Sequence, residues 1–197
     1  MSETGKQEQQ PRETFLYRFA IGQDSHRFVS ATETTSTVKP ATEKATGKVT
    51  GKATGSDRVL MLGGVEIPGA PALEGNSDAD VILHALTNAI SGITCVNILG
   101  APADKICLEK GITDSRVYLQ AALAELGDRQ LVHVSISVEA QRPRLSAHIP
   151  RIRASIADLL GLEPSDIGLT ATSGEGLTSC GRGEGIAVFC AVTAYGP

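Results

Sequence analysis

The sequence contains no tryptophan, and aromatic residues make up only 4% of its 197 residues. Valine, isoleucine, leucine and alanine must therefore fill any hydrophobic core. Hydrophobic residues make up 41% and charged residues 20% of the chain, a balance typical of a globular protein and too apolar for a wholly disordered one. A chain of this length is expected to form one domain that folds without disulfide bonds.

A basic surplus is also missing, since 18 lysines and arginines face 22 aspartates and glutamates and leave a formal charge of −4. This balance argues against a nucleic-acid partner. The cysteines show no C-x-x-C spacing, which argues against a disulfide framework and a thiolate zinc site. No apolar run is long enough for a membrane span or a signal core, so we expect a cytoplasmic protein with no membrane partner.

Two segments lack the apolar side chains that a core requires. Residues 1–14 are polar, and residues 30–57 contain eight threonines and four lysines but no leucine, isoleucine or aromatic residue. Such segments cannot repay the entropy lost on ordering. The sequence therefore predicts a disordered tail at 1–14 and a single domain at 15–197, interrupted by a flexible Thr/Lys/Gly-rich insertion at 30–57.

Strand and helix patterns mix along the remaining sequence. Strands are predicted at residues 17–22, 132–138, 167–171 and 186–192, and a hairpin at 59–67 turns at Gly63-Gly64. Apolar residues alternate with other residues at 132–138 and at 167–171, which predicts one core-facing side for each strand and places Val132 on that side. The nearly continuous apolar run at 186–192 indicates a strand covered on both faces. Helices are predicted at 114–126, at 149–159, and after a capping box of Ser77 and Asp80 as far as residue 92. This pattern is typical of an α/β or α+β fold with helices packed on a sheet.

Three residues could form a metal site. Asp24 and His26 lie two residues apart in a predicted extended segment, where their side chains point to the same side. His84, on the helix that follows Ser77, offers a third ligand. One aspartate and two histidines suit zinc with a fourth position left open for a substrate oxygen. On these residues alone, a hydrogen-bonded surface pair and a buried structural histidine remain the alternatives.

A hydroxyl-rich loop follows the strand predicted at 167–171. Thr172 and Ser173 offer hydroxyls that suit phosphate oxygens, and Glu175 offers a carboxylate that suits a divalent ion bridging those oxygens. The alternative is an ordinary strand exit with turn-forming residues. Arg182, in the glycine-rich segment that comes next, could bind phosphate or pair with Glu184. The segment lacks P-loop spacing, which argues against a nucleoside triphosphate site of that type.

A third candidate segment connects the strand at 132–138 to the following helix. It reads Ala140-Gln141-Arg142-Pro143-Arg144-Leu145-Ser146. Strand ends that open into helices are favoured ligand sites in α/β folds, and a helix start with basic residues is the alternative. We interpret His133 and His148 as surface or structural residues.

Together these segments resemble the 2-C-methyl-D-erythritol 2,4-cyclodiphosphate synthase family over residues 17–194. The resemblance rests on Asp24 and His26, on the helix start Ser77-Asp78-Ala79-Asp80-Val81 with His84, on residues 140–144, and on Gly-Arg-Gly-Glu-Gly at 181–185. It implies a mixed sheet covered by helices on one side, in a homotrimer whose sheets face the threefold axis. The implied active sites lie between neighbouring subunits.

The implied reaction is an intramolecular cyclisation in isoprenoid biosynthesis by the non-mevalonate pathway. The 2-phosphate of 4-diphosphocytidyl-2-C-methyl-D-erythritol 2-phosphate attacks the β-phosphorus, CMP leaves, and 2-C-methyl-D-erythritol 2,4-cyclodiphosphate forms. A phosphorus–oxygen lyase of this kind needs positioning and charge neutralisation above all.

The resemblance also assigns roles to residues of this chain. Zinc, one ion per subunit, is expected at Asp24, His26 and His84, and a second divalent cation, Mg²⁺ or Mn²⁺, is expected with the diphosphate near Glu175. Catalytic roles are expected for Ser77, Asp80, Thr172, Ser173 and Glu175. The CDP-linked substrate is expected to contact Ala140, Pro143, Arg144, Leu145, Ser146 and Arg182.

The chain departs from the family pattern where the family reads the sugar-alcohol part of the substrate. Asn76 stands where the family has histidine, and residues 97–104 replace an acidic loop. One alternative function is therefore a divergent phosphorus–oxygen lyase or cyclase acting on another CDP-linked substrate. Another is a non-catalytic trimeric protein that keeps zinc structurally or binds an isoprenoid diphosphate near Arg182.

Deleting residues 32–54 is expected to change the melting temperature by no more than a few degrees and to leave activity unchanged. The reason is that Val38 and Val49 are the largest apolar side chains in this segment. Calorimetry and a turnover assay on the shortened chain check this expectation. Loss of the oligomer or of turnover would show that the insertion is structural.

Overall fold

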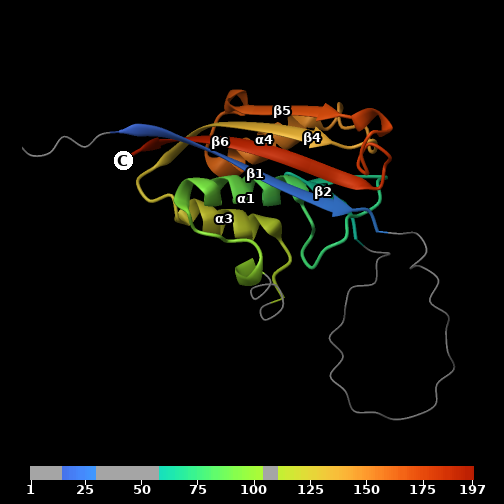
Figure 1. Ribbon diagram of the computed structural model, residues 1–197, viewed down its shortest axis with the longest axis horizontal. Helices are drawn as coiled ribbons and strands as arrows, with labels where there is room; N and C mark the ends of the chain where they lie inside the picture. Colours follow the sequence, from blue (N-terminus) through green and yellow to red (C-terminus); the bar gives the residue numbers. More distant parts are fainter. Residues whose placement is uncertain (1–14, 30–57, 104–110) are drawn as a thin grey trace, which may run out of the picture.

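The structure, a computed structural model, describes residues 15–29, 58–103 and 111–197. Within these residues, four strands form one sheet in the order β1, β6, β4, β5 (Figure 1). β4 and β5 run parallel, whereas β6 is antiparallel to both β1 and β4. The register pairs Leu16 with Gly196, so the first and last strands lie side by side. The strands are β1 (Leu16–Arg27), β4 (Gln130–Glu139), β5 (Ile167–Thr172) and β6 (Gly185–Gly196).

The helices α1 (Val81–Thr94), α3 (Ser115–Ala124) and α4 (Ile149–Leu160) lie on one face of this sheet (Figure 1). α1 packs on β1 and β6, α3 packs on α1, and α4 packs on β5. A hairpin of β2 (Leu60–Leu62) and β3 (Val65–Ile67) lies beside α1 and α4. The 3₁₀ turns η2 (Pro164–Asp166) and η3 (Gly174–Gly176) flank β5. The predicted mixed sheet with helices on one side is confirmed.

Every helix in the described residues is too short or too polar to span a bilayer. The predicted tail at 1–14 and the predicted insertion at 30–57 lie outside the described residues.

Most predicted elements form close to the expected positions. The hairpin turns at Gly63 and Gly64, whose φ values of 61° and 76° favour glycine. α4 ends at Leu160, and Gly161 caps the helix with a φ of 66°. β1 is longer than predicted and continues to Arg27, so Asp24 and His26 lie inside a paired strand.

The predicted capping box is wrong. α1 begins at Val81, and its N-cap is Asp80 rather than Ser77. The buried Asp80 carboxylate accepts hydrogen bonds from two backbone N–H groups of the first helical turn and from Gly63 and Gly64 of the hairpin. Burial raises the pKa of Asp80, and these backbone donors act in the opposite direction. One carboxylate therefore joins the helix start to the hairpin.

The predicted alternation of β4 fails at one position. Val132 was expected on the core side, but it is exposed and Leu131 is buried instead. The pairing of β4 with β6 shifts register between Leu131 and His133. An extra residue at such an irregularity moves the preceding side chains to the other face of the sheet.

The sheet carries an apolar surface on the side away from the helices, which we call the outer face. Tyr17, Phe19 and Ile21 of β1 are 72%, 74% and 72% exposed, and Phe189 of β6 is 55% exposed. The register places Phe189 opposite Gln23, on the same face as these β1 residues. The predicted cover on both faces of β6 is therefore wrong for the single chain.

Close contact between α1 and β1 depends on a glycine. A Cβ atom placed on Gly22 would lie 2.3 Å from the carbonyl oxygen of Ala85 and 2.3 Å from the backbone nitrogen of Ala89. These are helix backbone atoms that cannot rotate away. Gly92 of the helix makes a similar approach, because its Cβ would lie 2.8 Å from Cβ of Ala20. No other residue type fits between the strand and the helix at Gly22 without separating them.

Replacing Gly22 with alanine is expected to lower the free energy of unfolding by about 1–3 kcal/mol, the usual cost of overpacking. For a protein of this size, that change lowers the melting temperature by several degrees. The matched control is Gly168→Ala in β5, where the new Cβ would meet its nearest atom at an ordinary 3.6 Å. Thermal unfolding of both variants checks the expectation, and equal stability of the two would contradict it.

Candidate active site

Asp24, His26 and His84 converge on one point. Oδ2 of Asp24 lies 2.9 Å from Nε2 of His26 and 3.0 Å from Nδ1 of His84, and the two ring nitrogens are 3.3 Å apart. β1 supplies the first two side chains from alternate positions on its inner face, and α1 supplies the third across the Gly22 contact. The structure therefore brings together the three residues that the sequence predicted as metal ligands.

The donor set and its spacing fit a metal ion. Each of the three residues offers one ligand atom, and these atoms all lie within 4.8 Å of one another. Ligands about 2.0–2.1 Å from a common zinc ion have separations close to those seen here. An aspartate with two imidazoles is also a set of donors that zinc accepts. The cluster is thus a possible metal site.

The charges in this cluster support one another. Burial favours a neutral Asp24, but hydrogen bonds and charge attraction from His26 and His84 hold its pKa well below the usual range. Burial likewise opposes a charge on His26, but the hydrogen bond and charge of Asp24 raise its pKa. Asp24 is therefore a carboxylate at neutral pH, the form that binds a cation.

A cavity of about 320 Å³ opens beside the cluster. Asn76 and Ser77 line it from the loop before α1, and Tyr118 lines it from α3. Leu99, Gly100 and Ala103 belong to the segment that departs from the family pattern; residue 104 of that segment lies outside the described residues. The predicted residue Ser77 is thus beside the metal cluster.

The predicted catalytic residue Asp80 lies elsewhere. It is fully buried, and its oxygens are used by the backbone donors of α1 and the hairpin. It does not line the cavity beside the metal cluster. Its geometry supports a structural role.

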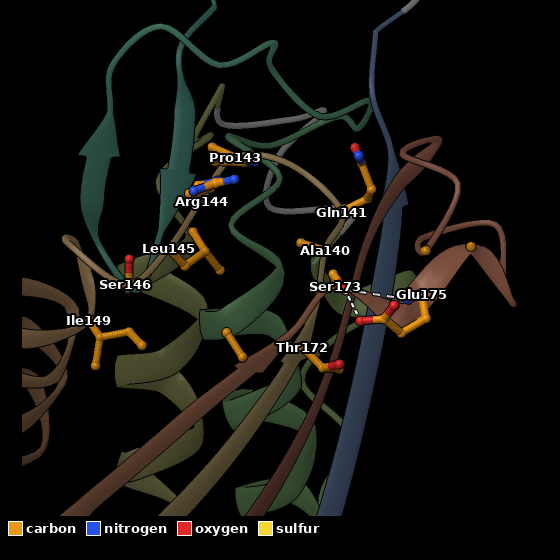
Figure 2. Close-up of a pocket in the computed structure, with 13 residues that line it drawn as sticks. Ala140, Gln141, Pro143, Arg144, Leu145, Ser146, Ile149, Thr172, Ser173 and Glu175 are labelled. Carbon is orange, nitrogen blue, oxygen red and sulfur yellow. Dashed lines mark hydrogen bonds between the residues drawn. The ribbon is translucent and has the colours of Figure 1, made fainter.

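A second cavity, of about 700 Å³, lies at the ends of β4 and β5. Figure 2 shows Arg144, Leu145 and Ser146 along one side of it, and Thr172, Ser173 and Glu175 on the other. The structure thus brings the predicted turn and the predicted hydroxyl-rich loop to one pocket. The predicted residues among its lining are Ala140, Pro143, Arg144, Leu145, Ser146, Thr172, Ser173 and Glu175.

The loop after β5 is shaped by short-range hydrogen bonds. The Ser173 hydroxyl lies 3.1 Å from Oε1 of Glu175 and accepts from the Glu175 backbone nitrogen at 3.4 Å. The Thr172 hydroxyl accepts from the backbone nitrogen of Gly174 at 3.3 Å. Gly174 has a φ of 69°, which favours glycine. The loop therefore presents two hydroxyls and one carboxylate beside the cavity.

Arg182 is not among the residues that line this cavity. Its guanidinium pairs with Glu184, Nε to Oε1 at 2.9 Å, and donates to the Ser179 hydroxyl at 3.1 Å. Both members of the pair are exposed to solvent. Of the two roles that the sequence left open for Arg182, the structure contains the pairing with Glu184.

Among the residues that the structure describes, none lines both cavities. They lie at the same end of the sheet but at opposite edges, because β1 and β5 are its outermost strands. Asp24 pairs with Val188, which pairs with Val138, which pairs with Ala171. Three strand spacings separate Asp24 from Ala171, or about 14 Å.

Sequence reasoning missed Ser115 and gave Asp78 no role. Oγ of Ser115 lies 2.8 Å from Nε2 of His84 and donates to Oδ1 of Asp78. Thirty-one residues separate Ser115 from His84 in the chain. The only local signal was a helix start after Asp114, which explains Ser115 without any site.

The fold and the site define an α/β protein with a mixed sheet, an Asp/His/His cluster that could hold a metal ion, and a hydroxyl-lined pocket at the same end of the sheet. Residues 17–195 match the model of the YgbB family, and the chain belongs to this family. It is 41% identical over 184 residues to 2-C-methyl-D-erythritol 2,4-cyclodiphosphate synthase from Chlamydia trachomatis serovar L2b, covering 93% of this chain and 90% of that protein. The protein of the same name from Chlamydia caviae is 39% identical, with 93% and 92% covered.

Solved structures share the fold. The bifunctional IspDF from Campylobacter jejuni aligns with 92% of this chain at a TM-score of 0.73 and 27% identity, and this chain spans 43% of that longer one. A structure of 2C-methyl-D-erythritol-2,4-cyclodiphosphate synthase aligns at a TM-score of 0.65 and 25% identity, covering 90% of this chain and 99% of that one. A form of such a synthase bound to CDP aligns at 0.63 with the same identity and coverage.

Replacing His84 with alanine is expected to abolish stoichiometric zinc binding while the protein stays folded, because two ligands rarely hold zinc in a protein. The matched control is His133→Ala, which removes an exposed histidine of β4. Metal analysis after dialysis, with circular dichroism as the check on folding, measures the outcome. Wild-type zinc content in the His84→Ala protein would refute the assignment.

Proposed function

We propose that this chain cyclises 4-diphosphocytidyl-2-C-methyl-D-erythritol 2-phosphate to 2-C-methyl-D-erythritol 2,4-cyclodiphosphate and releases CMP. The observation that carries this proposal is the joint presence of the Asp24, His26 and His84 cluster and the pocket lined by residues from the segments 140–146 and 172–175. The 41% identity to synthases of this name supports it across most of the chain.

The reaction makes modest demands on acid and base groups. The nucleophile is a phosphate oxygen that is already ionised near neutral pH, because the second pKa of a phosphate monoester is about 6. The leaving group, CMP, departs as another phosphate. No side chain has to remove or supply a proton, which agrees with the structural use of Asp80. Positioning and charge neutralisation therefore account for most of the rate.

We assign the metal site to zinc, held by Asp24, His26 and His84. Bound zinc would supply positive charge to phosphate oxygens of the substrate. Ser77, beside the cluster in the cavity of about 320 Å³, has a hydroxyl placed to orient the phosphate. Glu175 offers its carboxylate to a second divalent cation, Mg²⁺ or Mn²⁺, that accompanies the diphosphate. The hydroxyls of Thr172 and Ser173 are placed to hold the same group.

The cytidine part is assigned to the larger pocket. Six of the seven residues 140–146 line one side of it, and the side chains of Ala140, Pro143 and Ser146 are short enough for a ligand to reach the backbone. Backbone donors and acceptors suit the fixed edge of a base. A related synthase was solved in a CDP-bound form, which supports a cytidine nucleotide as part of the ligand.

We propose further that the active enzyme is a homotrimer. The two cavities of one chain lie at opposite sheet edges, so a ring of copies would bring the metal edge of one chain to the phosphate edge of the next. The outer face, with Phe19 and Ile21 more exposed than a solvated sheet surface normally allows, suits burial at the centre of that ring. Each active site then takes residues from two subunits.

One alternative is favoured by a specific observation. Asn76 and residues 99, 100 and 103 line the metal cavity, and these positions belong to the segments that depart from the family pattern. An asparagine is neutral at every pH, so it recognises a phosphate or hydroxyl differently from a histidine. The alternative is a cyclase acting on another CDP-linked substrate. Release of CMP from the methylerythritol substrate at normal rates would reject it.

Two inactive variants, His84→Ala and Glu175→Ala, are expected to restore activity when they are co-expressed in one cell. Each variant disables one half of the site, and a site formed by the intact half of each is complete. Random assembly would leave about a quarter of the sites intact. CMP release from 4-diphosphocytidyl-2-C-methyl-D-erythritol 2-phosphate measures the activity of each variant and of the mixture.

The control for Glu175→Ala is Glu66→Ala, which removes an exposed glutamate of β3 and should keep full activity. Wild-type protein that binds CDP but releases no CMP would overturn the proposed reaction. Active wild type with no restoration in the mixture would place both halves of the site in one chain and overturn the shared site.

A further inference from the structure

His84 takes part in a buried chain of hydrogen bonds on the side away from Asp24. Its Nδ1 faces Oδ2 of Asp24 at 3.0 Å, so its Nε2 points into the protein. There Oγ of Ser115 lies 2.8 Å away. Ser115 has no exposed surface, and His84 is only 9% exposed. The contact is thus shielded from water, where hydrogen bonds are strongest.

The directions of these hydrogen bonds follow from the Asp78 carboxylate, to which the Ser115 hydroxyl is bonded. A carboxylate can only accept, so the Ser115 hydroxyl hydrogen goes to Oδ1 of Asp78. The Ser115 oxygen is then left with lone pairs facing His84, and Nε2 of the histidine must be the donor. A neutral imidazole with its hydrogen on Nε2 has its free lone pair on Nδ1. That is the nitrogen beside Asp24.

Backbone hydrogen bonds also hold Ser115 and Asp78 in place. The backbone nitrogen of Ser115 donates to Oδ2 of Asp78 at 3.2 Å, and the backbone nitrogen of Asp78 donates to the Thr113 carbonyl at 2.7 Å. Asp78 and Ser115 are therefore locked together by contacts that do not involve the histidine. The Ser115 oxygen is thus held beside His84 independently of the imidazole.

We propose that Ser115 and Asp78 are positioning residues that set the tautomer and orientation of His84 for metal binding. Metal-bound histidines commonly donate their second nitrogen to a carboxylate or carbonyl, and such partners raise ligand basicity. Here Ser115 lies between His84 and Asp78 and transmits the effect of the carboxylate charge to the imidazole. The inference rests on the proposed metal site and is independent of which CDP-linked substrate is used.

A second hydroxyl also approaches the histidine but is less suited to this role. Oγ of Ser77 lies 3.3 Å from Nε2 of His84, longer than the 2.8 Å contact of Ser115. It also accepts from the Ala79 backbone nitrogen at 3.2 Å. Ser77 also lines the cavity, whereas Ser115 does not. The structure thus separates a serine that faces substrate from a serine that supports the ligand.

The test measures the zinc dissociation constant by competition with a chelator, for the full-length wild type and its variants. Ser115→Ala is expected to weaken zinc binding 10- to 100-fold, the usual effect of losing such a partner. The matched control is Ser91→Ala, which should leave the constant unchanged. Ser91 is a buried serine of α1 whose hydroxyl has no hydrogen-bond partner among the described residues.

A double-mutant cycle keeps the proposal testable even where one variant is unstable. Asp78→Asn alone should weaken zinc binding, but it should add little in the Ser115→Ala background, because its effect passes through the serine. Long-range proton–nitrogen NMR spectra of the histidines give a second readout. The Nε2 hydrogen of His84 should exchange slowly in the zinc-loaded wild type and quickly in Ser115→Ala.

Several outcomes overturn the proposal. One is a Ser115→Ala protein with wild-type zinc affinity and a slowly exchanging Nε2 hydrogen. Another is full additivity of the two substitutions. A wild-type protein that binds zinc through other residues would overturn both this proposal and the metal assignment. Zinc affinities that behave as expected in a protein that releases no CMP would leave the proposal standing and reject only the proposed reaction.

Discussion

The approach of α1 to β1 is the contact on which the site depends. A strand and a helix can bring their side chains to one ion only when their backbones are close, and here the absence of a side chain at Gly22 permits that distance. The same helix is fixed along its axis by Asp80, which ties the helix start to the hairpin. One contact sets how near His84 comes to Asp24, and the other sets how far along the strand it lies. Both are packing and capping features with no chemistry of their own.

Much of the fold follows from local pattern, and the exceptions have physical causes. Alternating apolar residues identified β4 and β5, and glycines identified the hairpin turn and the end of α4. The N-cap of α1 was misassigned because Ser77 and Asp80 are both good caps, and tertiary contact with Gly63 and Gly64 decided between them. The exposure of Val132 could not be predicted, because a register irregularity is set by the partner strand.

In the candidate site, too, residues marked by local spacing were predictable and residues placed by tertiary contacts were not. Asp24 and His26 were predictable as a pair because alternate residues of a strand share a face. His84 and the two loops were candidates from their residue types, and the family resemblance favoured these roles over their structural alternatives. The role of Ser115 could not be predicted, because it comes from a contact between α3 and α1 that local residue spacing does not indicate. Likewise, only the folded sheet shows that the two cavities lie on opposite edges. A ligand that contacts both kinds of cavity at once therefore cannot do so at one edge of a single chain.

Because Leu16 pairs with Gly196, the order of the strands in the chain could be changed by circular permutation. Antiparallel neighbours of this kind can be joined by a loop of two to five residues. A circularly permuted chain that closes this gap and opens at a surface loop elsewhere would place β6 before β1 in the covalent order while leaving every spatial neighbour unchanged. The join would lie at the end of the sheet away from Asp24 and His26. The covalent order of the strands could thus be changed while the positions of Asp24 and His26 are kept.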